Sequence, residues 1–167
     1  MAKQDIAIRD AGEADIVQIA PFFRAIVSAG ETYAYPEDLD DRAIAELWLE
    51  RSPGRTIVAL NSEGTILGSA KFGPNRPGRG AHIATASFMV DPAARGQGVG
   101  RALGEVVLKM AREQGFHGMQ FNAVVETNTA AVQLWQSLGF TIMTTIPEAF
   151  NHPQLGLVGL HVMYQKF

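Results

Sequence analysis

One run of the chain, Val90–Leu103, constrains the fold more than any other. An apolar strand pattern, Ser87–Val90, breaks at a proline turn, and a basic, glycine-rich loop and an amphipathic helix follow it. Gly96, Gly98 and Gly100 let the backbone approach a ligand and turn its amides toward one point. The helix adds unpaired N–H groups and the positive end of its dipole. The run therefore predicts a strand–loop–helix unit that holds a phosphate or pyrophosphate.

The spacing of this loop excludes two common phosphate-binding motifs. A Walker loop needs Lys and then Ser or Thr after its last glycine, whereas Arg101 and Ala102 follow Gly100. The dinucleotide-binding fingerprint needs its third glycine at position 101. The pattern that fits is Arg-x-x-Gly-x-Gly, formed by Arg95, Gly98 and Gly100. A glycine-rich turn that binds no ligand is the alternative interpretation.

The composition limits the other functions open to the chain. Its 167 residues suit one domain, 1–167, that can bury an apolar core without disulfides or bound metals. A formal net charge of −3 gives no reason to expect a nucleic-acid partner. The absence of cysteine excludes a disulfide scaffold and a cysteine nucleophile, and the four scattered histidines lack metal-ligand spacing. Because no signal peptide or membrane span is visible, we expect a cytoplasmic domain that binds no membrane and no metal.

Strand and helix patterns alternate along the chain, without a repeat, a linker or a low-complexity tract. Apolar periodicity and turn residues give the order β-α-α-β-β-β-α-β-α-β-β. We therefore predict one α/β (α+β) domain with a mixed, mainly antiparallel sheet of about seven strands and helices on both faces. A mobile loop is expected at 73–80. The expected strands are 6–10, 56–60, 66–72, 83–90, 119–125, 141–146 and 158–164, and the expected helices are 13–27, 41–49, 99–114 and 128–138.

A second motif lies at Asn128–Phe140. By itself it predicts a helix capped by Asn128 and stopped at Gly139. Together, the two motifs resemble the acetyl-CoA loop and the Asn-x-x-Ala-x-x-Leu-Tyr-x-x-x-Gly-Phe pattern of the GCN5-related N-acetyltransferases, the GNAT family. The one departure is Trp135, which stands where the family has tyrosine. More locally, the segment 121–142 resembles fungal acetyltransferases that act on proline analogues such as azetidine-2-carboxylate.

The resemblance implies a single N-acetyltransferase domain whose co-substrate is acetyl-CoA. In the family, the strand before the glycine loop carries a bulge and splays from the next strand, and pantetheine lies in the gap as a pseudo-strand. The implied CoA-binding residues belong to the glycine loop, its flanks and the later helix. They are Phe88, Met89, Val90, Arg95, Gly96, Gln97, Gly98, Val99, Gly100, Arg101, Asn128 and Trp135.

Acyl transfer to an amine needs a neutral amine, a donor for the thioester carbonyl and a proton for the departing thiolate. Val90, through its backbone N–H, is the candidate carbonyl donor, and Glu126 is the candidate base. Asn122, a polar amide in an apolar strand, either has a structural partner or holds the acceptor. Because an indole is no practical acid near neutral pH, Trp135 is interpreted as packing against the cofactor arm. A solvated Glu126 and a proton relay through water are the alternatives.

The acceptor site draws on the loop between the first two helices and on two strands. The candidate acceptor-binding residues are Tyr33, Tyr35, Thr85 and Asn122. We expect acetyl transfer to the amine of a small molecule by direct attack in a ternary complex, with an amino or imino acid as the favoured acceptor. A protein or peptide N-acetyltransferase and a non-catalytic acyl-CoA sensor are the alternatives. Members of the family are often dimers, so the resemblance leaves a monomer and a homodimer as alternatives.

Overall fold

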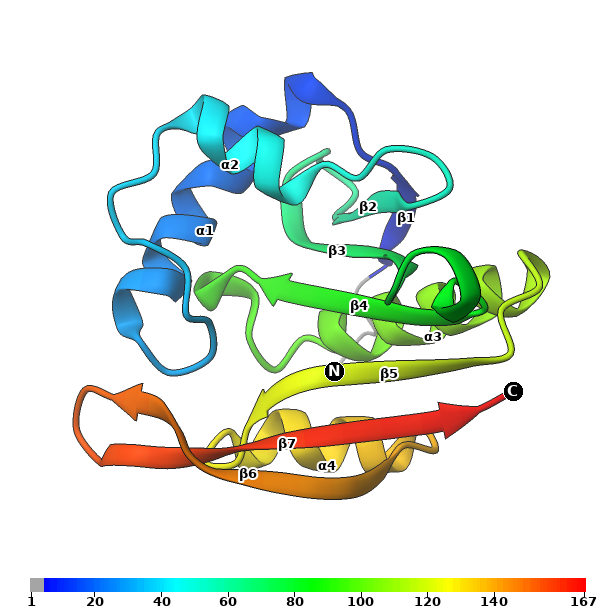
Figure 1. Cartoon of the computed structure of the whole chain (residues 1–167). Coiled ribbons are helices and arrows are strands. Elements are labelled where there is room, and N and C mark those ends of the chain that lie inside the picture. The colour runs from blue at the N-terminus through cyan, green and yellow to red at the C-terminus, as the bar shows by residue number, and fades with distance from the viewer. Residues whose placement is uncertain (1–4) are drawn as a thin grey trace.

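The computed structural model describes residues 5–167, and the first four residues of the polar amino terminus lie outside this range. Seven strands form one sheet in the order β1-β2-β3-β4-β5-β7-β6 (Figure 1). Every neighbouring pair is antiparallel except β4 and β5. The strands are β1 (Ala7–Asp10), β2 (Arg55–Leu60), β3 (Ile66–Pro74), β4 (Ile83–Val90), β5 (Gly118–Val125), β6 (Thr141–His152) and β7 (Gly156–Lys166).

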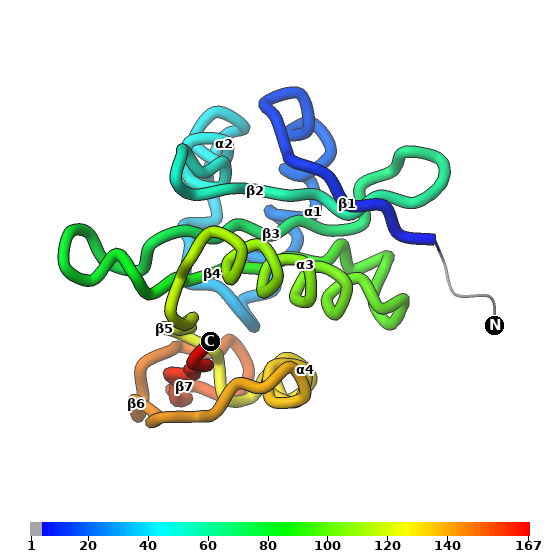
Figure 2. The backbone as a smooth tube through the Cα atoms, turned by 90° about the vertical axis from the view of Figure 1, so that its right-hand side faces the viewer, coloured from blue at the N-terminus to red at the C-terminus, as the bar shows by residue number. Residues whose placement is uncertain are grey.

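Helices cover both faces of this sheet, which confirms the predicted architecture. The helices α1 and α2 lie on one side of β2–β4, and α3 lies on the other side (Figure 2). The helix α4 packs beside β6. No helix within residues 5–167 has the length and apolar character needed to cross a bilayer. The α-helices are α1 (Ile16–Ala29), α2 (Asp41–Trp48), α3 (Val99–Glu113) and α4 (Thr129–Ser137).

Two large apolar cores hold these layers together, and a third, small cluster is formed by Val125, Phe150 and Val158. The first lies between the sheet, α3 and α4 and includes Leu103 and Phe121. The second lies between the sheet, α1 and α2 and includes Phe23 and Trp48. The fully buried Trp48 indole donates a hydrogen bond to Ser69 Oγ at 2.9 Å, so the polar N–H in the second core has a hydrogen-bond partner.

The strands β4 and β5 pair only where they begin. Ile83 and Ala84 of β4 face Gly118 and Met119 of β5, and the ladder ends there. Figure 1 shows the two strands diverging toward the end of β4 that leads into the glycine loop. This divergence gives β4 an open edge that faces the gap between the two strands.

The bulge expected on β4 is absent from its pairing with β3. The register between Gly68–Pro74 of β3 and Ala84–Val90 of β4 runs without a shift. The irregular strand is instead β5, whose register against β7 shifts between Phe121 and Val124. The open edge of β4 therefore results from the divergence of β5 and not from a bulge in β4 itself.

The last two strands are longer than the sequence pattern predicted. The expected strand 141–146 continues as β6 to His152, and the expected strand 158–164 lies within the longer β7. The apolar pattern ends at Ile146 because the register against β7 shifts between Ile146 and Phe150. Glu148 lies in this shift with a positive φ of 55°. Period-two alternation does not continue through such a bulge.

Candidate active site

The glycine loop bends so that its amides are free. Gly96 and Gly98 have φ values of 77° and 82°, a left-handed conformation that side chains rarely adopt. A Cβ at either position would meet no atom within 4 Å, so the space over the loop is open. The first helical bond of α3 runs from the Ala102 N–H to the Gly98 carbonyl, at 3.0 Å. Within residues 5–167, the N–H groups of 96 and 98–101 therefore have no acceptor, which fits an anionic ligand.

Packing beneath the loop holds it in place. Asp91 Oδ1 accepts a hydrogen bond from the Ala93 N–H at 2.9 Å, which closes the short turn between β4 and the loop. Val99 is buried under the loop, at 1% exposure. A Cβ at Gly68 of β3 would lie 3.0 Å from Val99 Cγ1 and 2.7 Å from the Met89 carbonyl. A glycine at 68 thus lets β3 approach the start of α3 closely.

The two arginines of the loop differ in their surroundings. The Arg101 guanidinium donates to Ser137 Oγ at 2.7 Å and lies 3.7 Å from Glu105. It is therefore directed toward α4 and along α3. Arg95 is exposed, and no ion pair or side-chain hydrogen bond joins it to another described residue. Of the two guanidinium groups, that of Arg95 is therefore the one available to pair with a phosphate.

The backbone of β4 presents alternate residues to the gap. The Asp91 N–H donates to the Leu67 carbonyl, and the Asn75 N–H donates to the Ile83 carbonyl, so odd-numbered residues bond β3. In an antiparallel ladder the even-numbered residues then point their N–H and C=O groups the other way. Phe88 and Val90 therefore face the open side. This geometry points the Val90 N–H toward the gap, and its role as the carbonyl donor stays a prediction. The Phe88 N–H points the same way but donates to Tyr33 Oη at 2.9 Å.

Trp135 lies in the core behind this open edge. Its ring centroid is 4.5 Å from that of Phe88 and 5.0 Å from that of Phe121. A Cβ at Gly104 of α3 would lie 3.1 Å from the indole, so a glycine there lets α3 approach α4. The indole supports the Phe88 side of β4, and its contact with a cofactor arm stays a prediction.

The two asparagines hold different positions. Asn128 Oδ1 accepts a hydrogen bond from the Ala131 N–H at 3.3 Å, so this side chain caps α4 as expected. Asn122 lies in the irregular part of β5, with an exposed side chain. Its Nδ2 donates to Asn75 Oδ1 at 2.7 Å, and its Oδ1 accepts from Gln120 Nε2 at 2.9 Å. The Asn122 amide therefore has structural partners in addition to any ligand.

Glu126 is turned toward β7. Its Oε1 accepts a hydrogen bond from the Gly159 N–H at 2.6 Å, and its carboxyl group packs against the backbone there. Glu126 does not line the hollow that contains the other acceptor candidates. Its role as a base stays a prediction.

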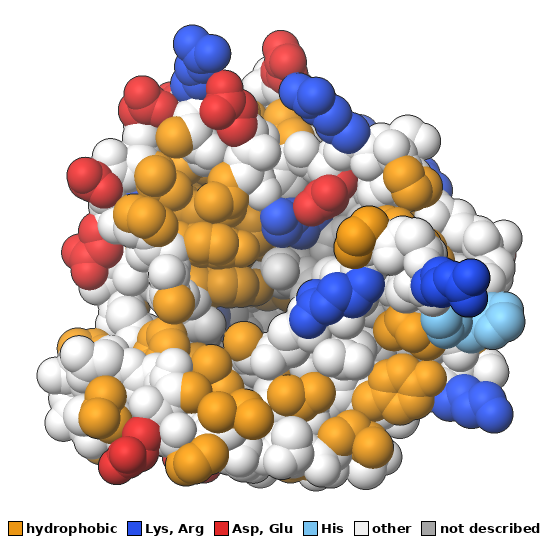
Figure 3. Space-filling model, viewed as in Figure 1, with side chains coloured by type: hydrophobic (Ala, Val, Ile, Leu, Met, Phe, Trp, Pro, Cys, Tyr) orange, Lys and Arg blue, Asp and Glu red, His pale blue; other side chains and the backbone are white. Residues whose placement is uncertain are grey.

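A hollow of about 410 Å³ opens beside β4 and brings three of the four acceptor candidates together: Tyr35, Thr85 and Asn122. Figure 3 shows a depression in the middle of this face, with basic and acidic side chains beside it. Burial raises the pKa of the Tyr35 hydroxyl. The fourth candidate, Tyr33, lies next to the hollow, with its ring stacked on Tyr35 at 5.3 Å.

Three charged residues of this hollow were not among the expected site residues: Glu50, Arg51 and Lys71. Lys71 lies 3.1 Å from Glu50 and donates to the Leu47 carbonyl at 2.6 Å. Its ammonium group also lies 5.7 Å from the centre of the Trp48 ring. A lysine inside an otherwise apolar central strand is the sequence signal that points to Lys71.

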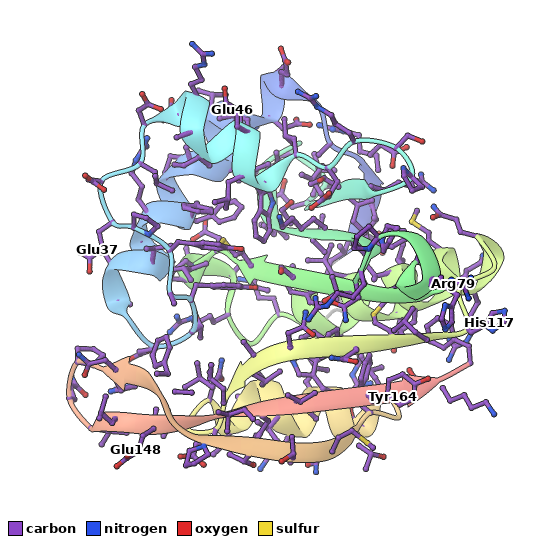
Figure 4. All side chains as sticks on the ribbon, in the orientation of Figure 1. Glu37, Glu46, Arg79, His117, Glu148 and Tyr164 are labelled. Atoms are coloured by element: carbon purple, nitrogen blue, oxygen red, sulfur yellow. The ribbon has the colours of Figure 1, made fainter. Side chains whose placement is uncertain are left out.

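The closed end of the β4–β5 gap contains two histidines. The His117 N–H donates to the His82 carbonyl at 2.8 Å, and the two rings meet edge to face at 5.7 Å. Figure 4 labels His117 at this end of the molecule. Within the described residues, no three His, Asp or Glu side chains gather as metal ligands.

The comparisons with known proteins agree with this arrangement. The acetyltransferase (GNAT) family model matches residues 20–140. Among solved structures, a GCN5-related N-acetyltransferase from Kribbella flavida is 58% identical, covers 97% of this chain and 98% of its own, and superposes with a TM-score of 0.94. An acetyltransferase from Salmonella typhimurium, solved with its cofactor acetyl-CoA, is 26% identical over 97% of this chain and 94% of its own, with a TM-score of 0.81.

Two curated relatives differ in how much of their length is matched. The N-acetyltransferase aca1 of Schizosaccharomyces pombe is 35% identical over 98 residues, 59% of this chain but only 47% of that protein. A methionine sulfoximine/methionine sulfone acetyltransferase of Pseudomonas paraeruginosa is 32% identical over 85% of this chain and 84% of its own. The family match covers most of the chain, and the free amides of the glycine loop fit the phosphates of CoA. The chain therefore belongs to the GNAT family of acetyltransferases and uses acetyl-CoA as its acyl donor.

Proposed function

We propose that the chain acetylates the amino group of a small acceptor that also has a carboxylate, such as an amino or imino acid. One observation carries the proposal: the hollow beside the open edge of β4 contains two cations and one carboxylate. Such a set of charges matches an acceptor with a carboxylate at one end and an ammonium group at the other. The volume of about 410 Å³ suits a small molecule rather than a long peptide.

The two cations of the hollow have hydrogen-bond donors that other groups within residues 5–167 do not use. The Lys71 ammonium group has three N–H donors; it donates one to the Leu47 carbonyl and lies 3.1 Å from Glu50 Oε1. An N–H that the Leu47 carbonyl does not use is available to an acceptor carboxylate. Arg51 is exposed and makes no ion pair with a described residue. Two cations and one carboxylate give the hollow a net charge of +1, which attracts an anionic group.

The acetyl thioester of the bound donor supplies the acyl carbon, and the chain supplies position, donors and a proton acceptor. The Val90 N–H faces the gap and can donate to an oxygen there. The Phe88 N–H donates to Tyr33 Oη in this structure and can do the same once that hydroxyl is displaced. Glu50 and Glu126 are the two carboxylates proposed to accept the amine proton. The Asn122 amide, which also lines the hollow, is proposed to orient the acceptor.

The matched relatives support a small acceptor. The Pseudomonas protein is named for acetylating methionine sulfoximine and methionine sulfone. Another relative, 30% identical over 86% of this chain, is named an L-amino acid N-acyltransferase. Both acceptor classes combine an amine with a carboxylate. This combination is the one that the charges of the hollow favour.

The test is CoA release with acetyl-CoA and a panel of amino acids, azetidine-2-carboxylate, amino-acid amides, polyamines and short peptides. We expect turnover with amines that have a carboxylate. Lys71→Met should raise KM for these acceptors roughly 10- to 150-fold, the value of a charged hydrogen bond of about 1.5–3 kcal/mol, and change KM for the matching amides little. Lys109→Met is the matched control, because Lys109 is exposed on α3 and lies 3.8 Å from Glu113.

Other outcomes would replace the proposal. Turnover with peptides only would indicate a protein N-acetyltransferase. Acetyl-CoA binding without turnover across the panel would indicate an acyl-CoA sensor. Equal KM values of Lys71→Met and the parent chain for a carboxylate-bearing acceptor would remove Lys71 from the acceptor site.

A further inference from the structure

A single hydroxyl group holds both backbone groups of one residue on the open edge of β4. Tyr33 Oη donates to the Phe88 carbonyl at 2.7 Å and accepts from the Phe88 N–H at 2.9 Å. These two groups would otherwise face the gap between β4 and β5. The Tyr33 hydroxyl therefore occupies a position at which a ligand with one acceptor and one donor can bind β4.

The ring of Tyr33 packs against two other aromatic rings. It stacks on Tyr35 with an interplanar angle of 7° and meets Trp48 edge to face at 6.5 Å. Burial raises the pKa of the Tyr33 hydroxyl well above its ordinary value. The hydroxyl therefore keeps its proton at neutral pH and acts there as a hydrogen-bond donor.

We propose that the Tyr33 hydroxyl donates a hydrogen bond to the acyl carbonyl oxygen of bound acetyl-CoA, together with the Phe88 N–H. A carbonyl oxygen is an acceptor, so it can replace the hydroxyl oxygen at the Phe88 N–H. An amide N–H of the pantetheine arm can replace the hydroxyl proton at the Phe88 carbonyl. The released hydroxyl still has its proton, and the carbonyl oxygen at the Phe88 N–H is then the nearest acceptor.

This assignment gives the site a side-chain hydroxyl that position 135 lacks. Trp135 is buried against Phe88 and has no hydroxyl group. Two donors directed at one oxygen stabilise developing negative charge better than a single backbone N–H does. Tyr33 is therefore a catalytic residue in this proposal, in contact with the reacting carbonyl, rather than only part of the acceptor wall.

The test is infrared difference spectroscopy of acetyl-CoA labelled with ¹³C at the thioester carbonyl, without an acceptor. Binding to the parent chain should lower the carbonyl stretching frequency, and Tyr33→Phe should lose most of that shift while keeping the stacked ring. By calorimetry, the ratio of the Kd for CoA to the Kd for acetyl-CoA should fall about fivefold in Tyr33→Phe, the value of one neutral hydrogen bond of about 1 kcal/mol. Tyr164→Phe is the matched control, because Tyr164 lies on β7 outside the hollow, and it should keep the parent frequency.

An unchanged carbonyl frequency and an unchanged Kd ratio in Tyr33→Phe would overturn the proposal. If that variant does not fold, the parent chain labelled with ¹³C at the tyrosine Cζ position provides a second test. The chain has three tyrosines, so Tyr35→Phe and Tyr164→Phe assign the Tyr33 signal by elimination. The Tyr33 signal should move more with acetyl-CoA than with CoA, and equal movement would refute the contact. Since no acceptor is present, these results are independent of the acceptor class proposed above.

Discussion

Substitution of Gly98 separates the backbone requirement of the glycine loop from its charge requirement. Gly98 has a φ of 82° and precedes the first residue of α3, and a Cβ there would meet no atom within 4 Å. Gly98→Ala should therefore lower the free energy of unfolding by about 1–2 kcal/mol through backbone strain alone. Gly98→Glu adds the same strain and also places a carboxylate among the free amides of 96 and 98–101.

The charge of this carboxylate determines the difference between the two variants. At about 6 Å from a pyrophosphate with two negative charges, the repulsion is about 1.4 kcal/mol at the dielectric constant of water and about 5.5 kcal/mol at an effective value of 20. The loop is exposed, so the lower part of this range applies. We expect acetyl-CoA to bind Gly98→Glu roughly 10- to 150-fold more weakly than Gly98→Ala.

The assay is calorimetric titration of both variants with acetyl-CoA at low and high salt. Screening should reduce the difference between the two Kd values at 1 M salt, where the Debye length is about 3 Å. Thermal unfolding of the two variants should give similar Tm values, because the backbone strain is shared. Equal acetyl-CoA affinity of the two variants at low salt would refute the assignment of the free amides to the phosphates.

Two further perturbations test other parts of the molecule. Asn122→Ala should raise the acceptor KM or lower kcat while the Kd for acetyl-CoA stays constant, and parent activity would leave Asn122 with only its structural bonds to Asn75 and Gln120. The Arg9 guanidinium, 2.8 Å from both carboxylate oxygens of Asp15, holds the pKa of that carboxyl below its ordinary value. The resulting stabilisation is complete above the unfolded-state pKa of about 3.9 and is lost as the pH falls through the lower folded-state pKa. The urea midpoint of Asp15→Asn should therefore lie below that of the parent chain at pH 6, and this difference should shrink near pH 2; a constant difference would contradict the linkage.

The parts of the site that depend on neighbouring residues were predictable from the sequence. Gly98 adopts a left-handed conformation next to its own helix, and Asn128 caps a helix that starts one residue later. Both features need only local backbone geometry and an appropriate side chain. The order of strands and helices along the chain follows similarly from apolar periodicity, whereas the position of β7 between β5 and β6 in the sheet does not.

The remaining contacts depend on residues that only the folded chain brings together. Tyr33 reaches Phe88 across 55 positions, and Lys71 meets Glu50 from another element. Periodicity assigns each residue to a face but gives no partner on the next layer. The shift in β5 beside Asn122 was also not predictable, because the mainly apolar run 119–125 predicts one continuous strand and does not mark where its register against β7 changes.

Only Ile83 and Ala84 continue the hydrogen-bond ladder from β4 into β5, so two half-sheets, β1–β4 and β5–β7, meet at a narrow seam. A ligand along the open edge supplies donors and acceptors where the neighbouring strand has moved away. The acyl donor then serves as a tether between the two half-sheets in addition to its chemical role. In hydrogen exchange, the amide of Val90 reports the closing of this seam, because its protection depends on what occupies the gap, whereas the Phe88 amide already donates to Tyr33 Oη.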